Sequence, residues 1–199
     1  MVCFYKVLRE GGVALYSGMH WTLPVDGEEW GAWMPPIEGE LVSCQNGYHV
    51  VTVWQLPYHL DRYIHPVQVG GEVIMERKQT LARQARVGRA IVAWTPATMG
   101  EFARACAERA RGYADSAVAP YDIYTANQCA IVAHTGANYA SANARRITPA
   151  VISGVITAAT RARVAASAAS PITHNLAAYY AEARMQAEWL AEHLGLPLK

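Results

Sequence analysis

The chain has 199 residues and a formal net charge of +1, from 17 Lys and Arg against 16 Asp and Glu. This balance gives no field strong enough to indicate a nucleic-acid or membrane partner, and the apolar stretches are interrupted too often to cross a bilayer. The first residues lack the pattern of a secretory signal, so we expect a cytoplasmic protein. The four cysteines are far apart and form no C-x-x-C motif, which predicts free thiols rather than a disulfide framework.

The composition changes sharply near Pro96. Five of the six tryptophans precede this residue, whereas 29 alanines follow it. Aromatic sequence punctuated by Gly and Pro is typical of a strand-rich domain with many turns, and Ala-rich sequence favours helices. We therefore expect an α+β protein, with a β-rich domain over 1–95 and an Ala-rich helical bundle over 96–199.

The first half predicts short strands separated by turn residues. The strands are expected over 1–8, 40–44, 49–53, 67–69 together with 72–75, and 89–94. Two short helices are expected between them, over 54–63 and 78–86. The second helix is predicted from Leu81 and Ala85, which stand four residues apart among charged neighbours.

The second half opens with signals of a helix start. Pro96 suits a first helical turn and Thr98-x-x-Glu101 matches a capping box, so we expect a helix over 97–112 that ends at Gly112. The spacing of its apolar residues predicts one narrow buried face. That face comprises Met99, Phe102, Cys106 and Ala110.

The final helix has the clearest pattern of the chain, an apolar seam with alternating spacings of four and three. The seam comprises Leu176, Tyr180, Ala183, Ala187, Leu190 and Leu194, and Gly195 with Pro197 ends the helix. Residues 120–170 predict two or three closely packed helices with breaks at Gly136, Pro149 and Gly154. The dipeptide Ala-Asn, which begins at residues 126, 137 and 142, leaves open a degenerate repeat of the kind that builds β-solenoids.

The densest group of chemically active side chains runs from Ser43 to His49. Cys44 followed by the Asn46-Gly47 turn and His49 suggests a nucleophilic thiol folded back towards a base. The same residues also fit a plain β-hairpin in which Cys44 is a small apolar residue. With His59 and His65, these side chains match no common zinc spacing, so we expect no metal.

Two surface features accompany this group. Trp30 and Trp33 lie in a loop rich in Gly, Glu and Pro, where large rings have little core to enter, which favours a contact surface. Arg77, Lys78, Arg83 and Arg86 form the basic cluster, and on a helix Arg83 and Arg86 would share a face. We expect that cluster to be a solvated surface, with phosphate binding as the alternative. No G-x-G-x-x-G, Walker, G-x-S-x-G or H-E-x-x-H motif is present.

The order of these residues resembles an uncharacterised domain found widely in phage and bacterial genomes. The matching positions over about residues 3–95 are Lys6 in the first strand, Cys44, the Gly47-Tyr48-His49 turn, the strand that ends at 71, and Lys78. Members of that family often carry a second Cys two residues after the His, where this chain has Val51. The resemblance implies a phage or prophage context, hence a host-cell cytoplasm, and implies no activity.

The layout is also similar to ADP-ribosyltransferase folds, in which an aromatic residue and a glutamate line an NAD pocket. That similarity implies Tyr48, His49, Glu72 or Glu76 as the residues of such a site. The full signature of those enzymes is not present, so this similarity concerns the fold alone.

We expect, first, a phage-type accessory protein that binds a protein partner, from a host factor, a defence system or the virion, without a cofactor and with no established catalysis. Its contact residues would be Trp30, Trp33 and Tyr48, and the helical half would offer a surface for a homo-oligomer. The first alternative is an enzyme that uses NAD at Tyr48, His49 and Glu72, and the second is a structural virion-associated protein. Catalytic candidates are Cys44, His49, Glu72 and Glu76.

Overall fold

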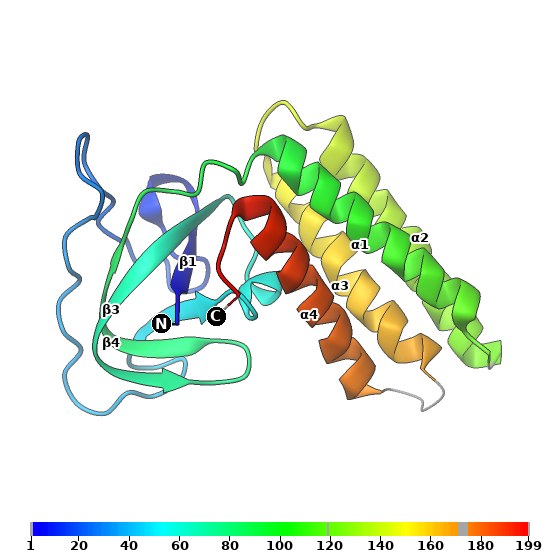
Figure 1. The fold of residues 1–199 in the computed structure, drawn as a ribbon, viewed down its shortest axis with the longest axis horizontal. Helices are drawn as coiled ribbons and strands as arrows, with labels where there is room; N and C mark the ends of the chain where they lie inside the picture. The colour runs from blue at the N-terminus through cyan, green and yellow to red at the C-terminus, as the bar shows by residue number, and fades with distance from the viewer. Residues whose placement is uncertain (1, 119, 171–174, 199) are drawn as a thin grey trace. The chain divides into compact units, whose positions relative to one another are not determined.

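A computed structural model describes residues 2–118, 120–170 and 175–198. The protein is a mixed α+β structure with a four-stranded closed barrel and four helices (Figure 1). The chain divides into two compact units. We call Met1–Val92, with the chain from Leu194 onward, the barrel unit, and Ala93–His193 the helical unit. Within the described ranges, no helix has the length and apolar character needed to span a membrane.

The barrel is built from antiparallel neighbours throughout. Its strands are β1 (Phe4–Leu8), β2 (Tyr48–Thr52), β3 (Tyr63–Met75) and β4 (Thr80–Val87), joined in the order β1-β2-β4-β3. Two short 3-10 helices, η1 (Glu10–Gly12) and η2 (Leu56–Tyr58), lie in the connections. Because the sheet closes on itself, each strand pairs with a neighbour along both of its edges.

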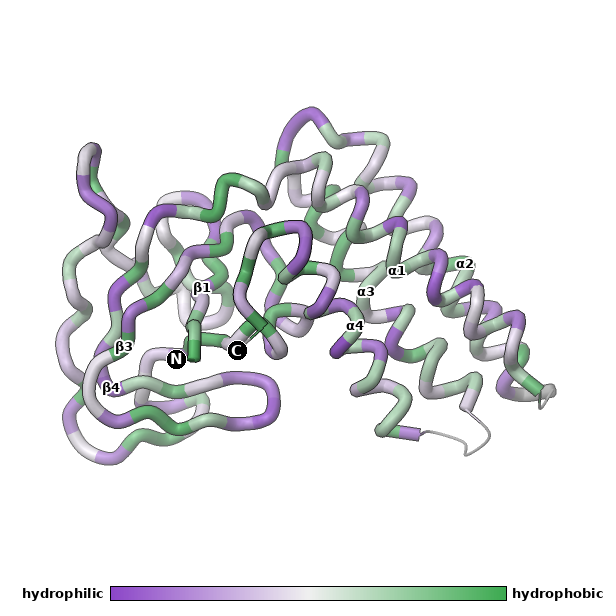
Figure 2. The backbone as a smooth tube through the Cα atoms, viewed as in Figure 1, coloured by the Kyte–Doolittle hydropathy of each residue, from purple (hydrophilic) through white to green (hydrophobic). Residues whose placement is uncertain are grey.

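β3 and β4 form a long hairpin whose register shifts between Gly70 and Val73. Gly71 lies at this bulge with a φ of +72°, in the left-handed region that favours glycine. The bulge explains why β3 runs unbroken through the Gly70-Gly71 pair, which the sequence suggested as a gap between two strands. Figure 2 shows the turn at the end of this hairpin as strongly hydrophilic.

The barrel interior is closed by residues from strands and loops alike. From the strands come Leu8, Tyr48, Val50, Val67, Ala85 and Val87, with Phe4 and Val69 packed against them, and from the loops come Ala14, Trp21 and Met34. Since strand side chains alternate between faces, Lys6 lies on the same side of β1 as Phe4 and Leu8. A lysine is therefore placed among the residues that line the apolar interior.

The helix predicted over 78–86 is wrong, because this segment is strand β4. A spacing of four residues, as between Leu81 and Ala85, fits the two-residue period of a strand as well as the 3.6-residue period of a helix. Pairing within the closed barrel makes this segment a strand. The helix predicted over 54–63 is also wrong, since only η2 forms there. Arg83 and Arg86 consequently share no helix face.

The strands predicted over 1–8 and 49–53 are confirmed as β1 and β2, with slightly different ends. The strands predicted over 40–44 and 89–94 do not form. Residues 42–46 make a tight turn instead, with the N–H groups of Gln45 and Asn46 both donating to the Val42 carbonyl. The reversal thus occurs before Asn46-Gly47, which leads directly into β2.

The helical unit consists of α1 (Pro96–Ser116), α2 (Pro120–Ala142), α3 (Pro149–Ala169) and α4 (Leu176–Leu194). The first three pack against one another. Helix α1 begins at the cap residue Thr95, whose side chain accepts a hydrogen bond from the Thr98 N–H, so Thr98 is the capped and not the capping residue. The predicted buried face of α1 is confirmed, with Met99, Phe102, Cys106 and Ala110 each at most 1% exposed.

The predicted stop at Gly112 and the breaks at Gly136 and Gly154 are wrong, because all three glycines lie inside helices. A β-carbon on Gly136 would lie 2.6 Å from the Gly154 carbonyl oxygen, and one on Gly154 would lie 2.4 Å from that of Gly136. These two glycines therefore allow the backbones of α2 and α3 to touch. Two long helices occupy 120–170, which excludes the β-solenoid for the described part of that region.

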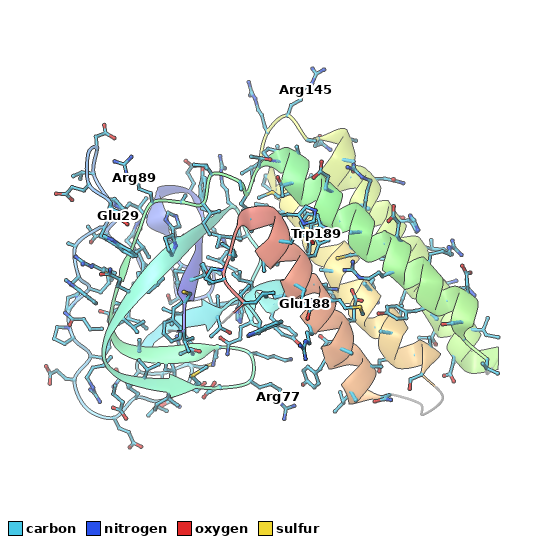
Figure 3. All side chains as sticks on the ribbon, in the orientation of Figure 1. Glu29, Arg77, Arg89, Arg145, Glu188 and Trp189 are labelled. Carbon is cyan, nitrogen blue, oxygen red and sulfur yellow. The ribbon has the colours of Figure 1, made fainter. Side chains whose placement is uncertain are left out.

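The seam predicted for α4 is buried at Ala183, Ala187, Leu190 and Leu194, whereas Leu176 is 63% exposed at the first turn. Further along the same helix, the Trp189 ring, labelled in Figure 3, lies 5.3 Å from the Phe102 ring and stacks on His193. The buried part of the apolar seam thus runs over about the last three turns of the helix.

A charged network is buried in the helical unit. Glu182, which is fully buried, accepts a bifurcated hydrogen bond from the single N–H of Arg109 Nε and another hydrogen bond from the Tyr113 hydroxyl. Gln186 links this carboxylate to Arg163, accepting a 2.6 Å hydrogen bond from Arg163 Nη1. Burial and the Glu182 charge together raise the pKa of Tyr113, which keeps this hydroxyl protonated as a donor.

Candidate functional site

The segment from Trp30 to Ile37 runs alongside β4 in extended form. The N–H groups of Gly31, Met34 and Ile37 donate to the carbonyls of β4 residues Val87, Ala85 and Arg83, respectively. Trp30 also forms a bridge with Gly88, next to Glu29 and Arg89, which Figure 3 labels. This loop is therefore held in place by the barrel, although the structure assigns most of it to no strand.

The Trp33 side chain is 40% exposed and packs against residues of the neighbouring strands. The Arg86 guanidinium lies 4.8 Å from the Trp33 ring centroid and 5.7 Å from that of Trp30, and its Nε donates to the Gln68 side chain at 2.8 Å. A β-carbon on Gly70 would lie 3.5 Å from the Trp33 ring, so glycine lets the ring approach the sheet. We call Trp30, Trp33 and Arg86 the tryptophan patch.

Tyr48 supports this patch from inside the barrel. Its side chain is 5% exposed, its ring meets the Trp21 ring edge-on at 5.4 Å, and its hydroxyl donates to the Pro35 carbonyl at 2.7 Å. Burial raises the pKa of Tyr48. Tyr48 thus anchors the segment that carries Trp33, and its own ring does not lie on the surface.

Three residues of the basic cluster, Lys78, Arg83 and Arg86, have different partners. Arg83 pairs with Glu72 at 2.6 Å and donates to the carbonyls of Ile37 and Gly39. Lys78, at the β3–β4 turn, lies over the Tyr58 ring. Arg77, labelled in Figure 3, occupies the same turn, whereas Arg86 belongs to the tryptophan patch.

A second group of polar side chains gathers at the β3–β4 turn. The Glu76 carboxylate accepts hydrogen bonds from the Ser43 hydroxyl at 3.0 Å and from the Gln79 amide at 2.9 Å, and Gln79 also donates to Ser43. Buried Gln55 stabilises the turn, since its amide nitrogen donates to the carbonyls of Glu76 and Gln79. The orientation of Glu76 is therefore fixed by side chains from three segments.

Cys44 and His49 are brought together, but through the cysteine backbone. The Cys44 N–H donates to His49 Nε2 at 3.2 Å, so the neutral ring carries its proton on Nδ1. Burial chiefly, and next the positive charge of Lys6, lower the pKa of His49. Since Nε2 is occupied, the imidazole is not aimed at the thiol in this state. Cys44 has a φ of +61° and is the sole non-glycine residue with positive φ in the described ranges.

Lys6 reaches the same cluster from β1. Its Nζ donates to the His49 carbonyl at 2.6 Å and lies 4.9 Å from the Trp21 ring centroid. Burial lowers the pKa of Lys6 from 10.5 to about 8. We call Lys6, Ser43, Cys44, His49, His59, Glu76 and Gln79 the polar cluster.

The two remaining candidate histidines are bonded to backbone carbonyls. His59 Nε2 lies 2.6 Å from the Lys78 oxygen and His65 Nδ1 lies 2.8 Å from that of Gly88. Burial is the main cause that lowers the pKa of both rings. Within the residues that could be searched, no three His, Cys, Asp or Glu side chains are arranged to hold a metal ion.

The residues suggested for an NAD site do not form one cluster. Tyr48 is a core residue, Glu72 pairs with Arg83 at the bulge, and His49 and Glu76 lie in the polar cluster. Comparison of the chain with protein-family models, with curated proteins and with solved structures finds no match.

Gln55 and Gln79 were not predicted as site residues, Arg86 was expected only in the basic cluster, and Lys6 entered only through a resemblance. A signal for Lys6 was available, because Phe4, Lys6 and Leu8 alternate in a strand that closes a barrel. No comparable signal marks Arg86, because the tryptophan rings that it contacts belong to a segment more than 50 residues earlier in the sequence.

Proposed function

We propose that the chain is a binding protein that recognises a protein partner through the tryptophan patch, as an accessory protein of phage type would. The observation that carries this proposal is the Trp33 ring, 40% exposed and held between Arg86 and the backbone of Gly70. Trp and Arg are the residue types that dominate binding energy in protein interfaces. The phage context is supported by the sequence resemblance alone, and the partner would come from the host, a defence system or the virion.

The preorganisation of the patch supports this function. Three backbone hydrogen bonds to β4, the Tyr48 hydroxyl on Pro35 and the Arg86 contact restrict the segment before any partner arrives. Ala32, Trp33, Pro35 and Pro36 are all exposed along it. An apolar surface that is already ordered loses little conformational entropy on binding, so more of the contact energy appears as affinity.

The test is co-purification of partners by the tagged full-length chain from a lysate of its native host. Trp33→Ala removes the exposed ring, and we expect it to lose a stoichiometric partner that the wild type retains. Tyr16→Ala is the matched control, because Tyr16 is 81% exposed in the same barrel unit and lies outside the tryptophan patch. Equal capture by the wild type and Trp33→Ala would contradict the proposal.

A second candidate, self-assembly through α2, is favoured by a separate observation. The single charged residue of this 23-residue helix is Asp122, which is 8% exposed. Tyr124, Ile131 and Tyr139 lie on one face at spacings of seven and eight, and are 66%, 50% and 60% exposed. An outer helix face without charges is typical of one that another surface covers.

This second candidate corresponds to a homo-oligomer or a structural virion component. We expect the wild type to form oligomers in light scattering at micromolar concentration and Ile131→Glu to be monomeric. A monomeric wild type at the highest soluble concentration would rule this candidate out and would leave the tryptophan patch proposal unaffected.

A further inference from the structure

The segment that carries the tryptophan patch buries every third residue. Gly31 and Met34 are buried and Ile37 is partly buried, and these are the residues whose N–H groups donate to β4. The residues between them are exposed, and they comprise Ala32, Trp33, Pro35 and Pro36. Pairing of the backbone with β4 therefore directs an apolar face outward along the whole segment.

Acidic side chains stand on both sides of this apolar face in the sequence. No lysine or arginine lies between Arg9 and Arg62. Five exposed carboxylates flank the two tryptophans, namely Asp26, Glu28, Glu29, Glu38 and Glu40. None of the five forms an ion pair with another residue that the structure describes. The negative charge around the patch is thus open to a partner.

Three arginines lie beside the segment, and their contacts are within the barrel unit. Arg83 donates to two carbonyls of the segment and pairs with Glu72, Arg86 lies over the two tryptophan rings, and Arg89 Nε donates to the Glu28 carbonyl at 2.7 Å. With Glu72 added to the five flanking residues, six carboxylates face three arginines, an excess of three negative charges. This surface attracts cations more than anions.

The Trp33 ring already holds one guanidinium. Arg86 lies 4.8 Å from the ring centroid, and the contacts with Arg86 and Gly70 leave 40% of the Trp33 side chain exposed. Tryptophan is the best aromatic partner for a cation, and the planar guanidinium of arginine stacks on such rings. The open part of the ring therefore suits a second arginine, whose repulsion from Arg86 the flanking carboxylates offset.

We propose that the tryptophan patch receives an arginine-bearing basic segment of its protein partner. One guanidinium of that segment stacks on the exposed part of Trp33, and its other cations face Glu28, Glu29 and Glu38. This inference rests on the proposed function and adds the chemistry of the partner to it. An acidic peptide or a nucleic acid is disfavoured, because like charges would be brought together at the contact.

The test titrates hexa-arginine amide into the ¹⁵N-labelled full-length chain and follows the indole N–H signals by NMR. The Trp33 signal is identified by its loss in Trp33→Phe. We expect hexa-arginine to shift this signal saturably, with an affinity that falls as salt is added. Hexa-lysine should bind more weakly, because an ammonium does not stack on the ring, and hexa-glutamate should leave the signal unmoved.

Two double variants with the same change in net charge separate local attraction from a general one. Glu28→Gln with Glu29→Gln should weaken hexa-arginine binding about fivefold. Glu101→Gln with Glu108→Gln, which removes two exposed carboxylates of α1, is the matched control and should bind as the wild type does. A Trp33 signal that does not respond to hexa-arginine, or an equal loss of affinity in both double variants, would overturn the inference.

Partner capture distinguishes a failure of this inference from a failure of the proposed function. If Trp33→Ala loses the partner while hexa-arginine leaves the Trp33 signal of the wild type unmoved, the patch is an interface and the basic chemistry of its partner is wrong. If Trp33→Ala retains the partner, the proposed function is wrong and this inference falls with it. Loss of the same partner from the Glu28→Gln and Glu29→Gln double variant, with a saturable hexa-arginine shift, supports both.

Discussion

Lys6 shows how a single partly buried side chain can reduce the stability of the barrel. Its pKa is lowered because the folded barrel disfavours the ammonium. Between pH 8 and 10.5 the unfolded chain therefore binds more protons at this site than the folded chain. The free energy of unfolding should rise with pH across that window.

Lys6→Met removes the charge and keeps much of the volume of the side chain. We expect this variant to be more stable than the wild type at pH 7 by about 1 to 2 kcal/mol, a value discounted for the partial exposure of the lysine. Urea unfolding at pH 7.5 and 9.5 measures the effect. Wild type should gain stability between these pH values relative to Lys6→Met, and a parallel response of both proteins would contradict the origin given for the shift.

Cys44 is a second residue at which a local rule is broken. Its left-handed backbone costs about 1 to 2 kcal/mol in a non-glycine residue, and most of all in a β-branched one. The hydrogen bond to His49 uses the backbone N–H, so every substitution except proline retains it. We expect Cys44→Gly to be at least as stable as the wild type and Cys44→Val to be less stable by about 1 to 2 kcal/mol. Equal thermal midpoints for the two variants would show that the turn relaxes.

Among the elements, the crossing of α2 and α3 depends most on individual residues. Gly136 and Gly154 face each other with no room for a β-carbon, whereas nothing lies within 4 Å of the β-carbon position at Gly112 in α1. Gly136→Ala should destabilise the helical unit by about 1 to 3 kcal/mol through overpacking. Gly112→Ala, the matched control, should stabilise it by about 1 kcal/mol. Chemical denaturation measures the free energy of unfolding of both variants. A loss of stability in both would contradict this account of the two glycines.

Helix α4 contains a buried charge and an exposed charge that can be compared directly. Glu182 is fully buried and accepts hydrogen bonds from Arg109, Tyr113 and Gln186. Glu188, labelled in Figure 3, pairs with Arg184 on the surface. Glu182→Ala leaves Arg109 without its partner and should cost about 3 to 5 kcal/mol. Glu188→Ala should cost at most about 0.5 kcal/mol, and similar midpoints in thermal unfolding would argue against a buried network.

Sequence patterns predicted the helices better than the barrel, for a physical reason. The face of α1 around Phe102 and Cys106 repeats every three to four residues and depends on local geometry alone. By contrast, the state of β4 depends on pairing with β2 and β3, which the spacing of Leu81 and Ala85 cannot reveal. Glycines were also misjudged, because Gly136 and Gly154 act in a close helix contact and not as breaks.

The candidate sites were predicted in part. The neighbourhood of Cys44 and His49 follows from a short turn, which is a local feature, and the structure brings both residues together. The exposure of Trp33 agrees with its loop composition. Two further contacts complete these sites: Arg86 lies over the tryptophan rings, and Lys6 donates to the His49 carbonyl. Both contacts join segments far apart in the sequence and require the closed barrel.

At the scale of the whole molecule, the barrel unit presents the tryptophan patch and the polar cluster on different elements. The patch lies on β4 and the segment beside it, while the cluster gathers residues from β1, β2, the 42–46 turn, the end of η2 and the β3–β4 turn. The helical unit has its own core and a buried charge network. We infer that the two sites can be altered independently, so a variant in one should leave the other intact.

The central claim, that Trp33 is the anchor of a protein interface, is tested most directly by the affinity of the captured partner for purified variants. We predict that Trp33→Ala weakens binding by 2 kcal/mol or more, about 30-fold, while its thermal midpoint stays within a few degrees of the wild type. Tyr16→Ala, at an 81% exposed aromatic residue of the same barrel unit, should bind normally. An unchanged affinity for Trp33→Ala in a folded chain would contradict the claim.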